Sequence, residues 1–221
     1  TMEGYRREPR LKPPFPTDSG LWGKPTVINN PETLANIPFI MSYGADTYSE
    51  IGTEEHQGTK IVSLTGSVLR PGIIEVPMGT TLRQIIYDLG GGTPPGKTLK
   101  AVAIGGPSSG ILPISKIDTP IKPGFLHESG VMLGSGGIIA LDEDTPLLSI
   151  IRKLAFYNAA ESCGKCTPCR EGTPRIVQAL DKLQSGSGHT ADLENLEYLA
   201  QIVNNTSLCG LGQAAGNPIL S

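Results

Sequence analysis

The feature that most constrains this chain is its set of four cysteines. Three of them lie close together in the stretch ESCGKCTPCREG, at the even spacing C-x2-C-x2-C: Cys163, Cys166 and Cys169. The fourth, Cys209, follows much later in SLCGLGQ, and the chain has no other cysteine. Any fold for this sequence must therefore explain why three thiols share one short segment while one thiol stands far away.

A cubane [4Fe–4S] cluster accounts best for this pattern. The cluster has four iron corners, and each corner is bound by one thiolate. A compact C-x2-C-x2-C loop can bind three corners, the fourth ligand then comes from elsewhere in the fold, and no cysteine is left over. We therefore predict that a [4Fe–4S] cluster is held by Cys163, Cys166, Cys169 and Cys209.

The residues around the cysteines suit a tight, charged loop. Gly164 permits a sharp turn between two ligands, and Pro168 stiffens the loop. Lys165 and Arg170 can offset the negative charge that four thiolates bring to an oxidised cube. After Cys209, Gly210 and Gly212 leave the backbone free to point its amide groups at the cysteine sulfur.

Three other interpretations stay open but are weaker. Structural zinc usually uses paired C-x2-C knuckles, and the second pair is missing here. Two disulfides would need to bridge cysteines three residues apart, in a chain without signs of secretion. A catalytic thiol would need a nearby base, and the histidines are scattered along the chain, at His56, His127 and His189.

Length and composition predict a globular protein in a reducing compartment. The length of 221 residues is enough for one large domain or two small ones. The composition, 38% hydrophobic and 18% charged, is typical of a globular protein. The net charge of −3 gives no reason to expect nucleic-acid binding. No apolar run approaches the ~20 residues of a spanning helix, and the polar, basic start is unlike a signal peptide. We expect a cytoplasmic protein with no nucleic-acid partner and no direct membrane insertion.

The first of three predicted regions, residues 1–57, cannot bury a core. It begins with a proline-rich, basic stretch that excludes helix. One helix is predicted after it, with Asn30 as its cap, Pro31 as its first residue and Gly44 at its end. We interpret this region as the C-terminal tail of a truncated larger domain.

The other two regions predict an α+β protein. Residues 58–142 contain the strands KIVSLTGSVL, IIEVP, LKAVAIGG and GGIIAL, with a helix in TTLRQIIYDLGGG that Thr80 would cap, which is a small β-grasp pattern. Residues 143–221 contain three apolar-striped helices, with Pro174 near the start of the second, which favours an antiparallel helical bundle. In an up-down-up arrangement, both cysteine segments can fall at one end of the bundle.

With the cysteines placed, the chain resembles a known family. ESCGKCTPCREGT with the later LCGLG is similar to the flavin-bearing, NADH-oxidising subunit of respiratory complex I, and to the diaphorase subunits of NAD-linked hydrogenases and formate dehydrogenases. GYRREPRLKPPFPTDSGLWGKPTVINNPETL resembles the stretch that closes the FMN site in that family. VSLTGSVLRPGIIEVPMGTTLRQII resembles its β-grasp module, of the ubiquitin-like, soluble-ligand-binding type.

The resemblance implies a role in electron transfer. The intact subunit would take a hydride from NADH onto FMN and pass electrons singly to the [4Fe–4S] cluster. Asn29, Asn30 and Thr33 would lie against the FMN ribityl-phosphate, and no residue of this chain is assigned a catalytic role. The implied partners are other redox subunits of a multisubunit complex, a small [2Fe–2S] subunit and a larger iron–sulfur subunit, which would place the chain at the inner face of a membrane.

One departure from the family limits the expected activity. The glycine-rich flavin and NADH domain that precedes this part in the family has no counterpart here, so we expect this chain alone to be inactive with NADH. The terminal acceptor stays open among quinone, ferredoxin, hydrogenase and formate dehydrogenase. The alternative function is a non-redox assembly or docking module with a structural metal. The basic run Arg6, Arg7, Arg10 and Lys12 can face a cofactor phosphate or an acidic partner, or form a solvated extended segment.

Overall fold

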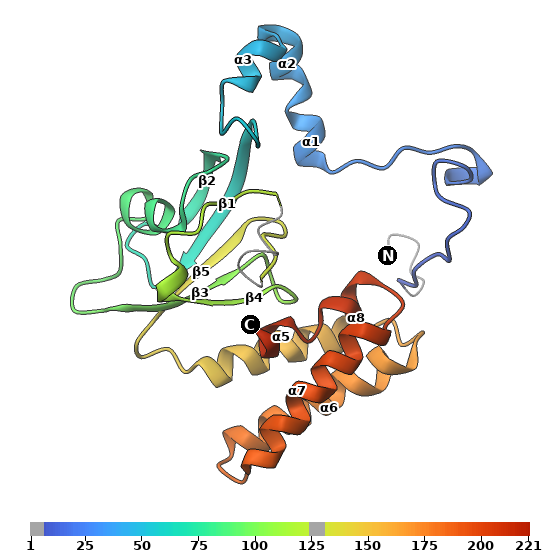
Figure 1. The fold of residues 1–221 in the computed structure, drawn as a ribbon, viewed down its shortest axis with the longest axis vertical. Coiled ribbons are helices and arrows are strands. Elements are labelled where there is room, and N and C mark those ends of the chain that lie inside the picture. The colour runs from blue at the N-terminus through green and yellow to red at the C-terminus, as the bar shows by residue number, and fades with distance from the viewer. Residues whose placement is uncertain (1–6, 124–130) are drawn as a thin grey trace.

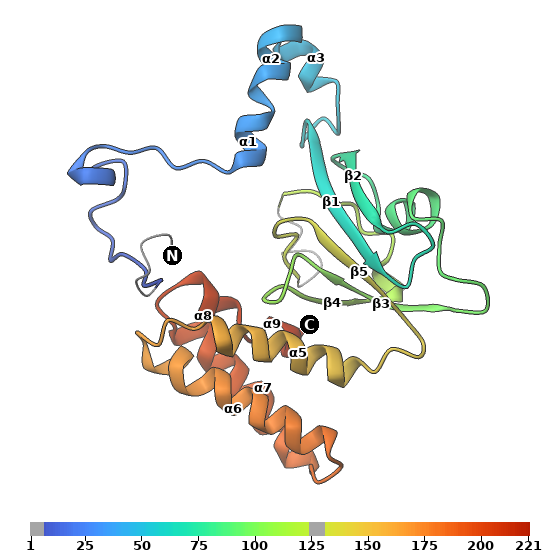
Figure 2. The same cartoon turned by 180° about the vertical axis from the view of Figure 1, so that it is seen from behind.

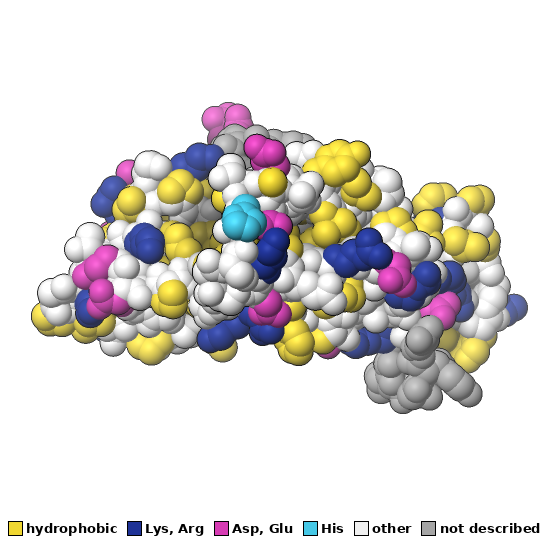
Figure 3. Space-filling model, turned by 90° about the horizontal axis from the view of Figure 1, so that it is seen from below, with side chains coloured by type: hydrophobic (Ala, Val, Ile, Leu, Met, Phe, Trp, Pro, Cys, Tyr) yellow, Lys and Arg dark blue, Asp and Glu magenta, His cyan; other side chains and the backbone are white. Residues whose placement is uncertain are grey.

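The computed structural model describes residues 7–123 and 131–221 (Figure 1). A mixed five-stranded sheet and a group of helices form its main body, which confirms the predicted α+β class. Arg6 and His127 lie outside the described residues. On the face shown in Figure 3, basic and acidic side chains are interspersed, in keeping with the small net charge. None of the described helices combines the length and apolarity needed to cross a membrane.

The sheet has the strand order β2-β1-β5-β3-β4. Its strands are β1 (Thr59–Gly66), β2 (Gly72–Pro77), β3 (Leu99–Ile104), β4 (Gly110–Pro113) and β5 (Gly137–Asp142). β1 is antiparallel to β2 and parallel to β5, while β3 is antiparallel to both β5 and β4. Four of these strands were predicted, and the short strand β4 was not.

One face of the sheet is covered by a helical segment that follows β2. This segment contains the π-helix η2 (Gln84–Leu89), and its apolar residues Leu82, Ile85 and Ile86 are fully buried against the sheet. The predicted cap Thr80 is wrong by one position. The Thr81 hydroxyl accepts a hydrogen bond from the Gln84 backbone N–H at 3.2 Å, and the Gln84 side chain accepts one from the Thr81 N–H at 2.9 Å. This reciprocal pair is a capping box.

The other face of the sheet packs against the helices of the C-terminal region. These helices are α5 (Leu147–Glu161), α6 (Thr167–Gln184), α7 (Thr190–Thr206), α8 (Gly210–Ala214) and α9 (Asn217–Leu220). One side of α5 contacts Ala101, Ala103 and Leu141 of the sheet, and α5, α6 and α7 share a second apolar core (Figure 2). Helix α5 therefore lies between the sheet and the helices α6 and α7, and joins them.

A buried polar contact reinforces this junction. The Asn158 side chain on α5 is 1% exposed, and it accepts a hydrogen bond from the Ser108 hydroxyl at 2.6 Å and donates one to the Pro107 carbonyl at 3.2 Å. The Asn217 side chain donates to the Ser108 carbonyl at 3.0 Å. The loop between β3 and β4 is thus fixed to two helices, which orients the helices relative to the sheet.

The N-terminal region extends away from both cores (Figure 1). It contains η1 (Leu21–Gly23), α1 (Pro31–Ala35), α2 (Ile37–Tyr43) and α3 (Ala45–Ser49), and none of these has a buried residue. The cap Asn30 and the end at Gly44 are as predicted, but the single predicted helix is divided at Asn36. The division follows from Pro38, which has no N–H to donate to the Leu34 carbonyl.

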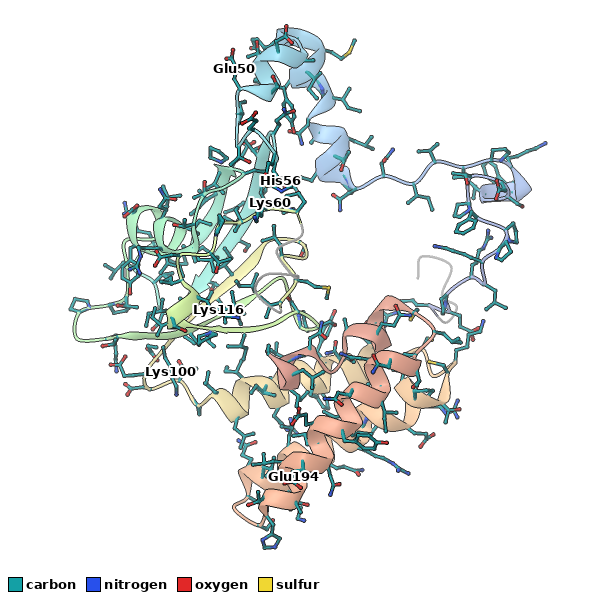
Figure 4. All side chains as sticks on the ribbon, viewed as in Figure 1. Glu50, His56, Lys60, Lys100, Lys116 and Glu194 are labelled. Carbon is teal, nitrogen blue, oxygen red and sulfur yellow. The ribbon has the colours of Figure 1, made fainter. Side chains whose placement is uncertain are left out.

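Glu32 on α1 connects this region to the sheet. One carboxylate oxygen pairs with the Lys60 ammonium on β1, and the other accepts a hydrogen bond from the Ile61 N–H at 2.8 Å. Figure 4 labels Lys60. Burial raises the pKa of the Glu32 carboxyl, but the hydrogen bonds from Ile61 and Lys60 bring that pKa below its ordinary value. The contact therefore favours the ionised carboxylate and holds α1 beside β1.

Replacing Glu32 with alanine is expected to speed hydrogen exchange of the Ile61 amide by about tenfold to a hundredfold, because a hydrogen bond to a charged group contributes ~1.5–3 kcal/mol. The buried Leu64 amide on the same strand is the control and should not change. Because the folded pKa is the lower one, the stabilisation is present above the unfolded pKa and is lost as pH falls through the folded pKa. In the wild-type protein, exchange of the Ile61 amide should therefore become faster below pH about 4.3. Equal Ile61 exchange in the two proteins would contradict the contact.

Candidate metal centre

The structure brings the four cysteines together around one cavity. Cys163 and Cys166 lie in the loop between α5 and α6, Cys169 lies in the first turn of α6, and Cys209 directly precedes α8. All four line a cavity of about 110 Å³, and all four are free thiols. Two segments that are distant in sequence thus place their sulfur-bearing residues at the same end of the helical region.

The local fold of the first segment differs from the prediction at one point. The second helix was expected to begin near Pro174, but α6 begins at Thr167, so Cys169 is helical and Pro174 is internal. Pro168 supplies the helix start instead, since proline is tolerated in the first turn. An interior proline costs ~3 kcal/mol or more, and the helix nevertheless continues through Pro174 with the neighbouring Ile176 buried in the helical core. The predicted turn at Gly164 is present, with φ of 76°.

Helix N-termini and backbone amides favour negative charge on sulfur here. Cys166 is the N-cap of α6 and Cys209 is the N-cap of α8, so each precedes helical N–H groups. Burial raises the pKa of the Cys166 thiol, but hydrogen bonds from the backbone N–H groups of Leu208 and Cys169 bring that pKa below its ordinary value. The Leu208 amide comes from the Cys209 segment, so this contact also joins the two cysteine segments.

Cys169 shows that the four sulfurs share one electrostatic environment. Burial raises the pKa of the Cys169 thiol, while a hydrogen bond with the Ser162 hydroxyl, 3.2 Å from its sulfur, lowers it. Negative charge on Cys166, Cys209 and Cys163 raises it further. Four thiolates at this site would repel one another, so the donor set suits an occupant that carries several positive charges.

Two cations lie beside the cysteines, as predicted from their positions, but they do different things. Lys165 lines the cavity and pairs with Glu8 of the N-terminal region at 3.3 Å. The Arg170 guanidinium donates to the Gly164 carbonyl at 3.0 Å and pairs with Glu171 at 3.1 Å. Lys165 therefore contributes positive charge to the cavity wall, whereas Arg170 also braces the turn between the ligands.

Gly212, in the Cys209 segment, lies close to Cys169 of the other cysteine segment. A Cβ at Gly212 would lie 2.4 Å from the Ser207 Cβ and 3.2 Å from the Cys169 Cβ. Gly210, by contrast, has open space at its Cβ position. The roles of Ser207 and Gly212, which contact Cys166 and Cys169 of the other segment, were not predicted, because they depend on contacts between distant parts of the chain.

The residues present fit a four-iron cluster. The cavity volume is several times the ~10–15 Å³ that one water molecule requires. The four cysteines line this one cavity, and a set of four thiolates suits a cluster in which each thiolate binds a different iron.

The residues predicted to contact FMN lie apart from the cysteines. Asn29, Asn30 and Thr33 are exposed and belong to α1 and the extended segment before it, while the cysteine cavity lies at the α8 end of the helices (Figures 1 and 2). The Asn30 side chain accepts a hydrogen bond from the Glu32 N–H at 2.9 Å, so it caps α1. Its capping role is therefore present whether or not it also binds flavin.

Comparison with known proteins finds two matching families. Residues 61–112 match the SLBB domain, and residues 149–221 match the NADH-ubiquinone oxidoreductase-F iron-sulfur binding region. The second match contains all four cysteines. It begins near the start of α5 and therefore coincides with the helical region of the fold.

Curated relatives and a solved structure extend the similarity over the chain. The HndC subunit of the NADP-reducing hydrogenase of Solidesulfovibrio fructosivorans is 49% identical over 100% of this chain and 45% of its own length. The F subunit of the NADH-quinone oxidoreductase of Escherichia coli is 39% identical over 100% of this chain and 50% of its own length. The crystal structure of an NAD+-reducing [NiFe]-hydrogenase in the H2-reduced state superimposes with a TM-score of 0.86 at 33% identity, covering 96% of this chain and 36% of that chain.

The chain spans about half the length of the curated relatives it matches. Those relatives are subunits of oxidoreductase enzymes. The chain thus resembles the C-terminal part of NADH-quinone oxidoreductase F subunits and of the related diaphorase subunits of NAD-linked hydrogenases, and it carries an SLBB domain and an iron–sulfur binding region of the NADH-ubiquinone oxidoreductase-F type.

Proposed function

We propose that this chain relays single electrons through a [4Fe–4S] cluster, as part of the flavoprotein subunit of an NADH:acceptor oxidoreductase. The observation that carries the proposal is the cavity that Cys163, Cys166, Cys169 and Cys209 line from two distant segments. The match of residues 149–221 to an iron–sulfur binding region supports it. When bound, the cluster supplies a one-electron redox centre.

The protein's own residues prepare the site for that cluster. The four thiolates would bind iron, and hydrogen bonds from the backbone N–H groups of Leu208 and Cys169 lower the pKa of the Cys166 thiol and so favour its thiolate. Lys165 places a positive charge at the cavity wall, which favours the more negative, reduced state. Burial of Cys169 keeps part of the site out of water, so these charges act in a medium of lower dielectric than bulk solvent.

In the intact subunit, we propose that NADH reduces FMN and that Asn29, Asn30 and Thr33 contact the flavin. Unpartnered apolar side chains near them support a further protein surface there, since Trp22 is 87% exposed and Ile28 is 74% exposed. A polypeptide that packs against residues 11–43 would cover this surface. The subunit would then pass electrons to other redox subunits, a small [2Fe–2S] subunit and a larger iron–sulfur subunit.

We propose that residues 1–57, 58–142 and 143–221 belong to three domains. For residues 58–142, the order β2-β1-β5-β3, with a parallel central pair and one helix across a face, supports a β-grasp module. For residues 143–221, the core shared by α5, α6 and α7 supports an antiparallel helical bundle. Residues 1–57 would belong to the flavin domain.

The function is tested by two titrations of the anaerobic chain. Dithionite is expected to bleach the cluster absorbance, whereas NADH is expected to leave it unchanged. Hydride transfer needs nicotinamide stacked on flavin in a pre-formed site, and the few hydrogen bonds that Asn29, Asn30 and Thr33 can offer, at net ~1 kcal/mol each, do not offset the cost of association. Bleaching by NADH without added flavoprotein would contradict the proposal. Bound zinc in place of iron would instead favour a docking module with a structural metal.

A further inference from the structure

Three residues of the N-terminal region, residues 7–9, lie against the cysteine cavity. Arg7 and Pro9 line the cavity together with the cysteines. The start of the described chain lies beside α8 in both ribbon views, although the rest of the N-terminal region extends away (Figures 1 and 2). Within the N-terminal region, the contact with the cysteine cavity is therefore confined to its first described residues.

Two ion pairs hold this segment in place, and the segment supplies the cation in one and the anion in the other. The Arg7 guanidinium pairs with the Glu161 carboxylate, and the Glu8 carboxylate pairs with the Lys165 ammonium at 3.3 Å. Glu161 and Lys165 both line the cavity, one on each side of Cys163 in sequence. The adjacent Arg7 and Glu8 thus meet Glu161, at the end of α5, and Lys165, in the cysteine loop, and this order of charges favours one alignment of the segment.

The partners on the cysteine loop are partly shielded from water. The Glu161 side chain is 27% exposed and the Lys165 side chain is 34% exposed. A single surface ion pair contributes little, but two pairs on adjacent residues share the entropy cost of ordering one segment. Pro9 limits that cost further because its ring fixes φ. The Arg10 guanidinium also donates to the Gly20 carbonyl at 3.4 Å, which steadies the segment from its other end.

We propose that residues 7–9 form a clasp that closes the cysteine cavity to solvent and keeps the metal in it. The proposal rests on the proposed function, in which the cavity holds a cluster. The clasp also gives Arg7 and Lys165 a defined place beside the negative site. The clasp also connects the cysteine loop to the chain segment that leads to Asn29 and Asn30. The candidate cluster site and the candidate FMN contacts are therefore linked by one continuous segment.

The test is a charge swap in the anaerobically purified chain. Arg7→Glu and Glu161→Arg are each expected to speed cluster loss to an iron chelator by about threefold to fivefold, which is the range that an exposed ion pair supports. The double variant, with both charges exchanged, is expected to return to within about twofold of the wild-type rate. Rescue by the double variant separates the pairing from a general effect of either substitution.

The matched control is an ion pair of the same kind elsewhere on the same helices. Arg152 on α5 pairs with Asp181 on α6 at 2.7 Å and does not line the cavity. Arg152→Glu is expected to leave the rate of cluster loss unchanged. Single clasp variants that lose the cluster no faster than Arg152→Glu, or a double variant that shows no rescue, would overturn the proposal.

A second measurement separates failure of the clasp from failure of the proposed function. The rate of thiol alkylation by iodoacetamide reports access to the cysteines whether or not iron is bound. It is expected to rise in each single variant and to fall again in the double variant. If the purified wild type holds no iron, the proposed function fails, yet the alkylation rates still decide the clasp: an unchanged rate in the single variants refutes it.

Discussion

Replacing Cys209 with alanine is expected to destroy the [4Fe–4S] cluster or convert it to a form with fewer irons. Cys209 is far from the other cysteines in sequence, but it lines the same cavity as Cys163, Cys166 and Cys169. Removing it leaves one iron corner without a thiolate, and no further cysteine is present to replace it. Iron and inorganic sulfide content, together with the EPR spectrum of the reduced protein, measure the effect.

The control for this prediction is the residue next to Cys209. Leu208 lines the cavity and is 55% exposed, so Leu208→Ala removes cavity-lining atoms without removing a ligand. This variant should retain the iron content of the wild type. If Cys209→Ala also retains both the iron content and the spectrum, then Cys209 is not a ligand and the four-cysteine assignment is wrong.

A single methyl group at Gly212 is expected to have nearly as large an effect. Its Cβ would lie 2.4 Å from the Ser207 Cβ, which is closer than two carbon atoms can approach, and 3.2 Å from the Cys169 Cβ. Overpacking of this kind typically costs ~1–3 kcal/mol. The clash with Ser207 lies within the Cys209 segment, and the tight contact with Cys169 reaches the other cysteine segment. Because the Cys209 segment must shift to relieve both, Gly212→Ala should lower both the melting temperature, by several degrees, and the iron content.

Gly210→Ala is the matched control, since the same methyl group meets open space two residues earlier. It should leave the melting temperature within about one degree of the wild type. Neither glycine has a positive φ, so the two variants differ in steric contact and not in backbone strain. Equal melting temperatures and equal iron content for the two variants would show that the segments are not in the close contact described.

Periodicity and turn residues predicted the regular elements well where local signals decide them. Helix α7, from Thr190 to Thr206, is one of the three apolar-striped helices expected in residues 143–221, and Gly44 marks a helix end as predicted. The start of α6 was wrong because two prolines compete as start signals, and only the burial of the intervening turn selects Pro168. Strand β4 was missed because four residues, GILP, are too few to show alternation.

The ligand types of the site were predictable, but their surroundings were not. Cysteine spacing alone indicates a cluster, since the chemistry needs those residue types in that number. The contributions of Gly212 and Arg7 come from segments that meet Cys169 and Glu161 only in the folded chain. The packing of α5 against the sheet was also unpredicted, because an apolar face shows that a helix is buried but not which element buries it.

The most direct test of the iron–sulfur relay is analysis of the chain purified without oxygen. Chemical assay is expected to find about four irons and four inorganic sulfides per chain, as four cysteine ligands imply. Reduction by dithionite is expected to bleach the visible absorbance and to produce the EPR signal of a reduced [4Fe–4S] cluster. A chain that binds zinc without iron and sulfide, or that binds iron but shows no reducible cluster, would contradict a role in electron transfer.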